Sequence, residues 1–461
     1  MFKNFSKVHM VGVGGIGMSG IAEVLIAMNF KISGSDRTLS EVTDRLKQLG
    51  AEIFDGHSAK NLVDVDVLVY SSAVTLNNEE VAEAIKRKIP VIRRAEMLAE
   101  LMRLKYGIGI AGTHGKTTTT SMVGLVLLEA GFDPTVIVGG KLSGLGGTNA
   151  RLGSGDFIVV EADEFDRSFL QLTPTIAAIT TLESEHLDIY KDLDDIKAAF
   201  TEFANKVPFY GFVVLCLDEE GLQDILPHIN KKIVTYGLTS QADVRATDIE
   251  HFENTSKFKV KYKNKELGNI KLNIPGTHNV QNSLAAVAIA IELGIDFIQI
   301  KNALEKFTGV YRRFELKAEV NNIMIIDDYA HHPTEVAATL SGIRAGWDRR
   351  IIALFQPHLY TRTRDFYEEF AKAFLNCDVF ICLDIYPARE EPIQGITGEL
   401  IAESAKKIGH KNVLYVKDKH NVPDALTNVI KSGDIVVTMG AGDIWVYGEK
   451  FVELLKKGKI S

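Results

Sequence analysis

Short apolar runs alternate with amphipathic segments along nearly the whole chain. Each run has the length of a buried strand, and the segments between the runs have the apolar spacing of helices. This alternation predicts an α/β fold. The expected strands are residues 8–13, 30–33, 65–70, 106–111, 157–160, 176–181, 322–326, 351–355, 379–383, 413–416 and 435–439. The expected helices are residues 18–28, 81–88, 95–104, 118–130 and 283–293.

One stretch has a different pattern. Between residues 243 and 272 the apolar side chains alternate, with Phe258, Val260 and Tyr262 on one face, which predicts an antiparallel β insertion. Elsewhere the strand–helix pattern starts again twice, and 461 residues exceed what one ordinary core supports. We therefore expect three domains, at residues 1–105, 106–313 and 314–461.

Composition and charge narrow the class of protein. The chain is 46% hydrophobic and 24% charged, as in globular proteins, and its net charge of −8 disfavours nucleic acid as a partner. No apolar run approaches the roughly 20 residues of a membrane-spanning helix. Three cysteines without paired spacing support neither a disulfide framework nor a zinc site. We therefore expect a cytoplasmic protein without membrane insertion.

The strongest chemical motif is the glycine-rich run from Ile110 to Thr120. Backbone N–H groups of such a loop bind phosphate oxygens, Lys116 neutralises their charge, and the Thr117 hydroxyl can ligate Mg²⁺. Because magnesium prefers hard oxygen ligands, Glu161 at the end of a later strand is the expected second ligand; the alternative is a solvated carboxylate. The ordinary P-loop has glycine where this chain has Ile110, so the loop is a variant.

A second glycine loop lies near the start of the chain. Gly12, Gly14 and Gly17 have the dinucleotide-binding spacing, and Asp36 lies where a ribose-binding acid is expected. Taken alone, this motif predicts an NAD site.

Other polar residues open helices or follow strands, and each has two interpretations. His186 is a metal ligand or a structural histidine. Asn279, one helical turn from Asn282, faces a nucleotide or caps its helix. Arg313, with its neighbour Arg312, binds a phosphate or forms a solvated basic pair.

Later polar residues also follow expected strands. Asp328 can accept hydrogen bonds from a ribose, and Arg362 can hold a small carboxylate. The pair His331 and His332 is interpreted as part of a turn rather than as metal ligands.

In their order along the chain, these motifs resemble those of the Mur ligases. The resemblance covers the whole chain, with Glu185 and Ala330 as departures outside the proposed ligands. Its carriers are VGVGGIGMSG (11–20), GTHGKTTTT (112–120), EADE (161–164), ESEHLDIY (183–190), HNVQN (278–282), GVYRRFE (309–315), DDYAHHPTE (327–335) and FQPHLYTRT (355–363).

The resemblance implies a fold and an activity. The fold has an N-terminal Rossmann-like domain for a UDP-sugar, a central P-loop ATPase-like domain with a β insertion, and a C-terminal Rossmann-like domain for an amino acid. The activity is ATP-dependent ligation of L-alanine to the lactyl carboxylate of UDP-N-acetylmuramate through an acyl phosphate, a step of peptidoglycan synthesis. ATP is the co-substrate, two Mg²⁺ ions are expected, and the chain is a monomer or a homodimer.

The resemblance also assigns roles to residues. Lys116, Glu161, His186 and Arg313 act in catalysis, and Thr117, Glu161 and His186 bind metal. The ATP-binding residues are Gly112, Thr113, His114, Gly115, Lys116, Thr117, Thr118, Asn279, Asn282, Arg313 and Asp328. The UDP-sugar-binding residues are Gly14, Gly15, Ile16, Gly17, Asp36 and Ser72. The amino-acid-binding residues are Tyr329, His358 and Arg362.

Three other functions stay open at this stage. A related recycling ligase attaches a ready-made murein peptide to the same sugar nucleotide. An NAD-dependent oxidoreductase would explain the first glycine loop but leaves Lys116 and Glu161 without a role. A nucleotide-gated switch would bind ATP without ligation. In some relatives a modified lysine assists the second metal, and Lys197 is the position considered for it here.

Overall fold

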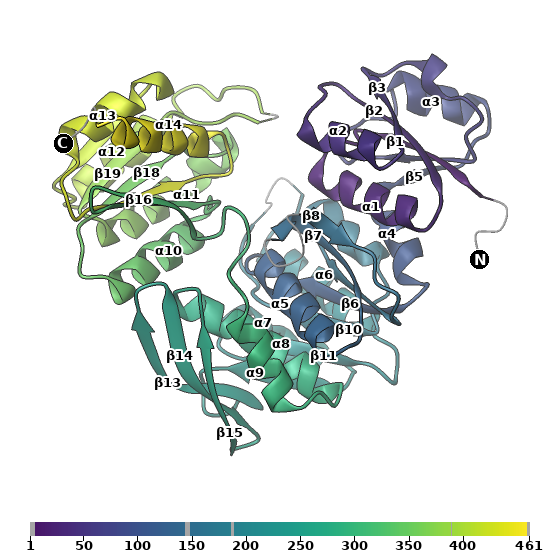
Figure 1. Cartoon of the computed structure of the whole chain (residues 1–461), viewed down its shortest axis with the longest axis horizontal. Coiled ribbons are helices and arrows are strands. Elements are labelled where there is room, and N and C mark those ends of the chain that lie inside the picture. The colour runs from purple at the N-terminus through teal and green to yellow at the C-terminus, as the bar shows by residue number, and fades with distance from the viewer. Residues whose placement is uncertain (1–4, 143–147, 186–188, 389, 459–461) are drawn as a thin grey trace. The chain divides into compact units, whose positions relative to one another are not determined.

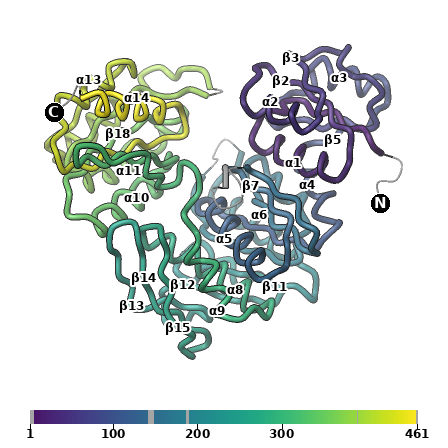
Figure 2. The backbone as a smooth tube through the Cα atoms, viewed as in Figure 1, coloured from purple at the N-terminus to yellow at the C-terminus, as the bar shows by residue number. Residues whose placement is uncertain are grey.

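Three β-sheets organise the chain (Figure 1). The computed structural model describes residues 5–142, 148–185, 189–388 and 390–458. It divides into two compact units, of residues 1–247, 259–270 and 281–307, and of residues 248–258, 271–280 and 308–461. The expected α/β fold with three sheet-forming regions is confirmed, and Figure 2 traces the same elements along the backbone.

The first sheet is wholly parallel, with strand order β3-β2-β1-β4-β5. Successive strands are added on one side of β1 up to β3 and on its other side from β4 onward. Open α/β sheets bind ligands at such a switch point, at the carboxyl ends of the strands. The strands are β1 (Lys7–Val11), β2 (Lys31–Asp36), β3 (Glu52–Asp55), β4 (Val67–Tyr70) and β5 (Val91–Arg93). The helices are α1 (Ile16–Ala27), α2 (Glu41–Gln48), the 3-10 helix η1 (Ala59–Asn61), α3 (Glu79–Lys86) and α4 (Arg94–Met102).

The second sheet has the order β15-β14-β13-β12-β11-β10-β6-β9-β7-β8. Its strands are β6 (Tyr106–Ala111), β7 (Thr135–Leu142), β8 (Thr148–Arg151), β9 (Phe157–Glu161), β10 (Ile176–Ile179), β11 (Phe212–Cys216), β12 (Ile233–Gly237), β13 (Val244–Phe252), β14 (Thr255–Tyr262) and β15 (Lys265–Leu272). The helices are α5 (Lys116–Glu129), η3 (Phe165–Gln171), α6 (Leu193–Asn205), α7 (Glu220–Ile225), α8 (Thr277–Glu292) and α9 (Phe297–Glu305).

The β insertion expected from the alternating pattern is strands β13 to β15, which extend the parallel part of this sheet. Another expected element ends early: the strand predicted to reach Thr181 stops at Ile179. There the hydroxyl groups of Thr180 and Thr181 bind the backbone of His114 in the loop after β6: Thr180 Oγ1 donates to its carbonyl, and Thr181 Oγ1 accepts from its N–H.

The third sheet has the order β16-β17-β21-β18-β19-β20, with β16 antiparallel to its neighbour and the others parallel. Alternate residues of β17 enter two separate cores: Met324 packs on one face and Ile325 on the other. The strands are β16 (Glu315–Val320), β17 (Ile323–Asp328), β18 (Ile351–Phe355), β19 (Val379–Leu383), β20 (Val413–Val416) and β21 (Ile435–Met439). The helices are α10 (Pro333–Gly346), α11 (Tyr360–Ala373), α12 (Gly398–Lys407), α13 (Val422–Val429) and α14 (Ile444–Lys456).

Two findings bear on the class of protein. Among the described helices, none is both long enough and apolar enough to cross a membrane. The three cysteines, Cys216, Cys377 and Cys382, are all buried and free.

An aromatic cluster fixes α6 to the second sheet. Phe169 lies with its ring centroid 5.1 Å from that of Phe200 and 5.0 Å from that of Phe203, and all three are buried. A side chain at Gly109 of β6 would come within 3.1 Å of the Phe203 ring, so the helix approaches the strand at its closest there.

We predict that Phe203→Ala lowers the free energy of unfolding by about 3–5 kcal/mol, because it opens a cavity in this cluster. Phe209, which is 94% exposed, provides the control: Phe209→Ala should change stability by less than about 0.5 kcal/mol. Urea unfolding followed by fluorescence measures both, and equal shifts for the two variants would contradict the prediction.

Candidate active site

The phosphate loop consists of the four residues Gly112 to Gly115, between β6 and α5. At Gly112, with φ +132°, a Cβ atom would lie 2.1 Å from Thr180 Oγ1. At Gly115, with φ +81°, it would lie 2.4 Å from Asn282 Oδ1. Both positions therefore require glycine. Ile110, where the ordinary P-loop has glycine, is a buried strand residue and lies outside the loop.

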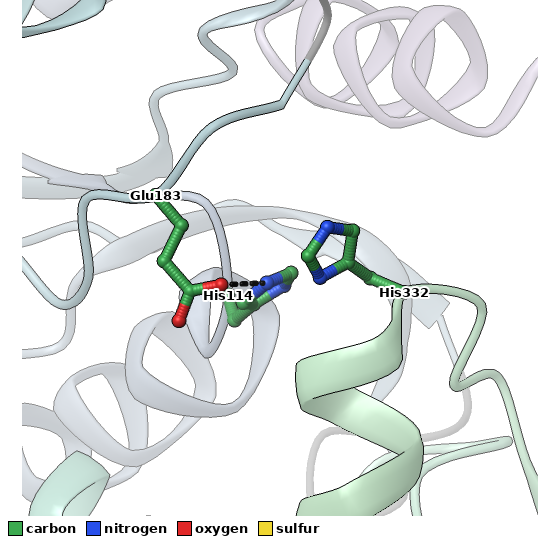
Figure 3. A group of neighbouring side chains, drawn as sticks. All are labelled: His114, Glu183 and His332. Carbon is green, nitrogen blue, oxygen red and sulfur yellow. Dashed lines mark ion pairs between the residues drawn. The ribbon is translucent and has the colours of Figure 1, made fainter. Parts of the chain in front are cut away.

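Thr181 holds this loop in place. Its Oγ1 accepts a hydrogen bond from the backbone N–H of His114 at 2.8 Å and lies 2.8 Å from Thr113 Oγ1. The His114 ring reaches the next segment, with Nε2 3.5 Å from Glu183 Oε2 (Figure 3). Thr181 was not predicted as a site residue, although its position at the end of the predicted strand 176–181 was a usable indication.

Lys116 begins α5 and is bound on three sides. Its Nζ donates to the carbonyl oxygens of Gly112 and Thr113, at 2.6 and 3.2 Å, and lies 2.8–2.9 Å from the Glu164 carboxylate. Burial by itself lowers the pKa of the lysine, but the charges of Glu164 and Asp163 outweigh it and raise that pKa well above its usual value. The partly buried ammonium is therefore charged. Glu164, only 1% exposed, was not predicted as a site residue.

The next residue, Thr117, lies beside the predicted carboxylate. Thr117 Oγ1 donates to Glu161 Oε1 at 2.6 Å, and Glu161 Oε2 accepts from the backbone N–H of Gly139. Adjacent oxygen ligands of an octahedral Mg²⁺ ion are about 2.9 Å apart, so this pair of hard oxygens fits the expected metal. Thr118 is buried in the same helical turn.

Of the two residues considered for the second metal, His186 and Lys197, the structure describes only Lys197. His186 lies outside the described residues, so its role stays a prediction. Lys197 Nζ lies 2.9 Å from Asp224 Oδ2, and hydrogen bonding to that carboxylate raises the pKa of the lysine. This ion pair keeps the Lys197 amine protonated, which opposes its covalent modification.

The two asparagines near the start of α8 make different contacts. Asn282 Oδ1 accepts from Thr119 Oγ1 at 3.3 Å and lies against Gly115, so Asn282 belongs to the phosphate loop's surroundings. Asn279 Nδ2 donates to the Pro275 carbonyl at 2.7 Å, across the start of the helix. Contact of either amide with adenine stays a prediction.

The first glycine loop is tied to the end of β2. The backbone N–H groups of Gly12 and Val13 donate to the Ser35 carbonyl at 2.8 and 3.1 Å. The N–H of Gly14 donates to Asp36 Oδ2 at 2.8 Å. Asp36, expected near a ribose or uridine, therefore shapes the loop with one of its carboxylate oxygens.

The start of α1, directly after this loop, lies against Arg94, which lines a cavity. Gly15 caps the helix, and Ile16 is 51% exposed. A Cβ at Gly17 would come within 2.9 Å of Arg94 Nη1. Arg94 and Ser72 line a cavity of about 190 Å³. The remaining lining residues are Tyr70, Val74, Thr75, Leu76, Arg93, Ala95, Phe165, Asp166 and Ser168. Arg93 and Arg94 were not predicted as site residues, although an arginine pair where a strand ends and a helix begins is suited to anion binding.

In the other compact unit, the two arginines that follow Gly309 make different contacts. Arg312 Nε donates to Asp327 Oδ2 at 2.8 Å, and its Nη2 donates to the Gly440 carbonyl at 2.7 Å, which makes it a structural residue. Arg313 Nη1 donates to Glu335 Oε1 at 3.1 Å. Burial alone would lower the pKa of Arg313, but Glu335 raises it, so the guanidinium keeps its charge.

Asp328 lies at the end of β17. Its carboxylate accepts hydrogen bonds from the N–H of Ala330 at 2.9 Å, the N–H of Phe314 at 3.2 Å and Thr339 Oγ1 at 3.0 Å. A carboxylate has about four acceptor sites, so one more donor can be accommodated. Burial raises the pKa of Asp328 to about 6, against the lowering effect of Arg313.

The three residues predicted for the amino acid are linked through His331. The Tyr329 and His331 ring centroids are 5.2 Å apart, and the His331 and His358 centroids are 6.0 Å apart. Arg362 Nη1 lies 3.4 Å from His358 Nδ1. The ring of Tyr386, which was not predicted, stacks on His358 with centroids 5.9 Å apart. The turn residue His331 thus lies among the residues predicted for the amino acid. His332, drawn in Figure 3, is buried and is the N-cap residue of α10.

Comparison with family models assigns all three regions to one family. The description "Mur ligase family, catalytic domain" matches residues 7–106, "Mur ligase middle domain" matches residues 110–290, and "Mur ligase, glutamate ligase domain" matches residues 312–442.

Individual relatives agree with these matches. The chain is 56% identical to the UDP-N-acetylmuramate–L-alanine ligase of Geotalea uraniireducens, over 99% of each chain. It is similar to the crystal structure of a UDP-N-acetylmuramate-alanine ligase from Thermotoga maritima, with a TM-score of 0.82, 31% identity and coverage of 98% and 99%. A murein peptide ligase from Psychrobacter arcticus, at 24% identity, TM-score 0.71 and 98% coverage of both chains, shares the fold. The chain therefore belongs to the Mur ligase family.

Proposed function

We propose that this chain ligates L-alanine to the lactyl carboxylate of UDP-N-acetylmuramate, with ATP as the energy source, in the first peptide-forming step of peptidoglycan synthesis. The observation that carries the proposal is the phosphate loop with charged Lys116 beside the Thr117–Glu161 pair, in a chain whose full length matches ligases of this activity. We place the enzyme in the cytoplasm, as a monomer or a homodimer.

The three reactants are assigned to three domains. Residues 1–105 bind the UDP-sugar, residues 106–313 bind ATP, and residues 314–461 bind alanine. The first amides of α1 to bond within the helix turn are those of Met18 and Ser19, which donate to the Gly15 carbonyl at 3.0 and 2.9 Å. The N–H groups of Ile16 and Gly17 precede them at the positive end of the helix, and they suit the UDP pyrophosphate as well as they would suit that of NAD. Arg94 and Ser72 in the adjoining cavity support this assignment.

The first chemical step is phosphoryl transfer. A lactyl carboxylate oxygen attacks the γ-phosphorus of ATP, the bond to the bridging oxygen breaks, and ADP leaves. Lys116 is a fixed positive charge at the start of α5, where the helix dipole also favours anions, and both stabilise the charge on the transferring group. Since the three donors of Lys116 are already bonded, phosphate binding replaces at least one of these bonds.

A magnesium ion, when bound, would lie on Thr117 and Glu161 and would neutralise phosphate charge. His186 would contact a second ion. Arg313 would bind the phosphates, and Asp328 would accept a ribose hydroxyl.

The second step forms the amide. The neutral amine of alanine attacks the acyl carbon, the bond to the phosphate oxygen breaks, and inorganic phosphate leaves. Arg362 would hold the alanine carboxylate, and His358 lies within 3.4 Å to orient that guanidinium. The rings of Tyr329, Tyr386 and His358, the last two stacked on each other, would lie around the alanine side chain.

One reaction separates this function from its rivals. The enzyme is mixed with ATP, Mg²⁺, UDP-N-acetylmuramate and either alanine or a murein tripeptide, and products are identified by mass spectrometry. The proposal requires the alanyl amide and equimolar ADP. Amide formation with the tripeptide alone would indicate the recycling ligase, and ATP hydrolysis without any amide would indicate a switch. The NAD-dependent class is tested by NAD reduction with the sugar nucleotide.

We predict that Lys116→Ala keeps the fold but reduces alanine-dependent ADP release by at least about a thousandfold, because it removes the charge facing the phosphate. A coupled ADP assay measures the rate, and circular dichroism checks the fold. Lys232→Ala, at a lysine with a 60% exposed side chain, is the control and should retain full activity. Turnover of Lys116→Ala near that of the control would refute the assignment of the loop.

Thr117→Val removes one proposed metal oxygen without changing side-chain volume. We expect the Mg²⁺ concentration that gives half-maximal phosphate release to rise about tenfold or more, since one hard ligand is lost. Thr117→Ser keeps the hydroxyl and should have the magnesium dependence of the wild type. Identical magnesium titrations for the valine and serine variants would exclude Thr117 as a ligand.

Asp328 gives ATP binding a dependence on pH. Because its pKa is raised to about 6, the carboxylate is ionised at pH 7.5 and gains a proton as the pH falls through 6, which weakens it as an acceptor for the ribose. The KM for ATP should therefore rise from pH 7.5 to 5.5. Asp328→Asn should raise that KM about tenfold at pH 7.5.

The nucleotide's own phosphates titrate in this range, so the ratio of the KM values of Asp328→Asn and wild type is the informative quantity. It should fall toward one as the pH decreases. A ratio that stays constant across this range would show that ionisation of Asp328 is unrelated to ATP binding.

A further inference from the structure

A buried polar cluster lies on the side of the first sheet that α3 and η1 cover. Its residues are His9 of β1, Ser35 of β2, His57, Asn61 of η1 and Glu80 of α3. His9, Ser35 and Glu80 are fully buried. A charged carboxylate without solvent is costly unless it is hydrogen-bonded, so this cluster requires an explanation.

Both oxygens of Glu80 have partners. Oε1 accepts from Asn61 Nδ2 at 2.6 Å and from the Ser58 N–H at 3.2 Å, and Oε2 accepts from Ser35 Oγ at 2.5 Å. His9 Nε2 and His57 Nδ1 each lie 3.5 Å from Oε2. Burial alone would raise the pKa of Glu80, but the interactions with His9, Ser35 and Asn61 lower it to about 2. Glu80 is thus an anion at neutral pH.

The combination of serine, histidine and glutamate is not a hydrolytic triad. In a triad the serine hydroxyl donates to histidine and the acid holds the other side of the ring. Here the Ser35 hydroxyl donates directly to Glu80, and its oxygen faces His57 Nδ1 at 2.8 Å. Ser35 is also 0% exposed, so no substrate reaches it.

Ser35 connects this cluster to the first glycine loop. Its carbonyl accepts the N–H groups of Gly12 and Val13, and the next residue, Asp36, accepts that of Gly14. Three consecutive loop amides are therefore held by two residues of β2, and the side chain of the first is held by Glu80.

We infer that Glu80 is a positioning residue for UDP-sugar binding: through Ser35 it fixes the loop at Gly12–Gly14, and hence the orientation of the amides at the start of α1. The inference rests on the proposed function, in which that loop binds the UDP pyrophosphate. Glu80 itself does not touch the substrate, because it is fully buried.

Steady-state kinetics of Glu80→Gln in the full-length chain test this inference. The variant keeps the size of the side chain but cannot accept from both sets of donors. The KM for UDP-N-acetylmuramate should rise about tenfold, with kcat and the KM values for ATP and alanine within about twofold of wild type. Glu83→Gln, one turn further along α3 and ion-paired with Arg87 at the surface, is the matched control and should change none of them.

Hydrogen exchange provides a second readout that does not depend on the reaction. Amides of a peptide covering residues 8–17 should exchange faster in Glu80→Gln, while those of β6 should be unchanged. If Glu80→Gln does not fold, Ser35→Ala breaks the same connection and takes its place in both measurements.

The outcomes separate the two proposals. A selective rise in the KM for the UDP-sugar together with faster exchange of the loop supports the inference. Unchanged kinetics, or a parallel change of all three KM values, overturns it. A wild-type enzyme that forms no amide refutes the proposed function instead. In that case, unchanged hydrogen exchange of the loop in Glu80→Gln refutes the inference that Glu80 fixes the loop through Ser35.

Discussion

The close approach of backbone and side chain at Gly112 and Gly115 is the constraint on which the ATP site depends. Neither position has room for a Cβ, and the groups that exclude it, Thr180 and Asn282, come from distant parts of the chain. The loop is therefore shaped by its surroundings rather than by its own residues. Lys116 and Thr117 follow this loop directly, as the first two residues of α5.

Charges that are partly or wholly removed from solvent are paired with compensating groups at several places in the chain. Lys116 faces Glu164, Arg313 faces Glu335, and Glu80 faces hydroxyl, amide and imidazole groups. Burying a charge opposes folding unless a partner compensates it. Each of these charges has such a partner, and two of them are the cations proposed to bind phosphate. A cation paired in this way stays charged, and its side chain keeps one orientation. An arriving phosphate must then replace one of the bonds that the cation already makes.

Much of the fold followed from local pattern. The strands 351–355, 379–383, 413–416 and 435–439 were predicted with their final bounds because each is a short apolar run between polar turns. Helix α5 begins two residues before its predicted start, since the loop leads directly into it. Motif and spacing predicted Lys116, Thr117 and Glu161, and the structure brings the side chains of Thr117 and Glu161 together, while the roles of all three stay predictions. Thr181, Glu164, Arg94 and Tyr386 were not, because their contacts join segments far apart in sequence and depend on which strands are neighbours in the sheet.

Asp36 illustrates what a sequence motif reports. A glycine loop followed by an acid about twenty residues later is a fingerprint for NAD. In this chain the acid binds the backbone of the loop, and it does so from the end of the neighbouring strand. The fingerprint therefore encodes the shape of a strand–loop–helix turn that presents amides to any pyrophosphate. A search that equates this fingerprint with a dinucleotide would place a chain of this kind among the dehydrogenases, so the presence of the acid does not by itself identify the ligand.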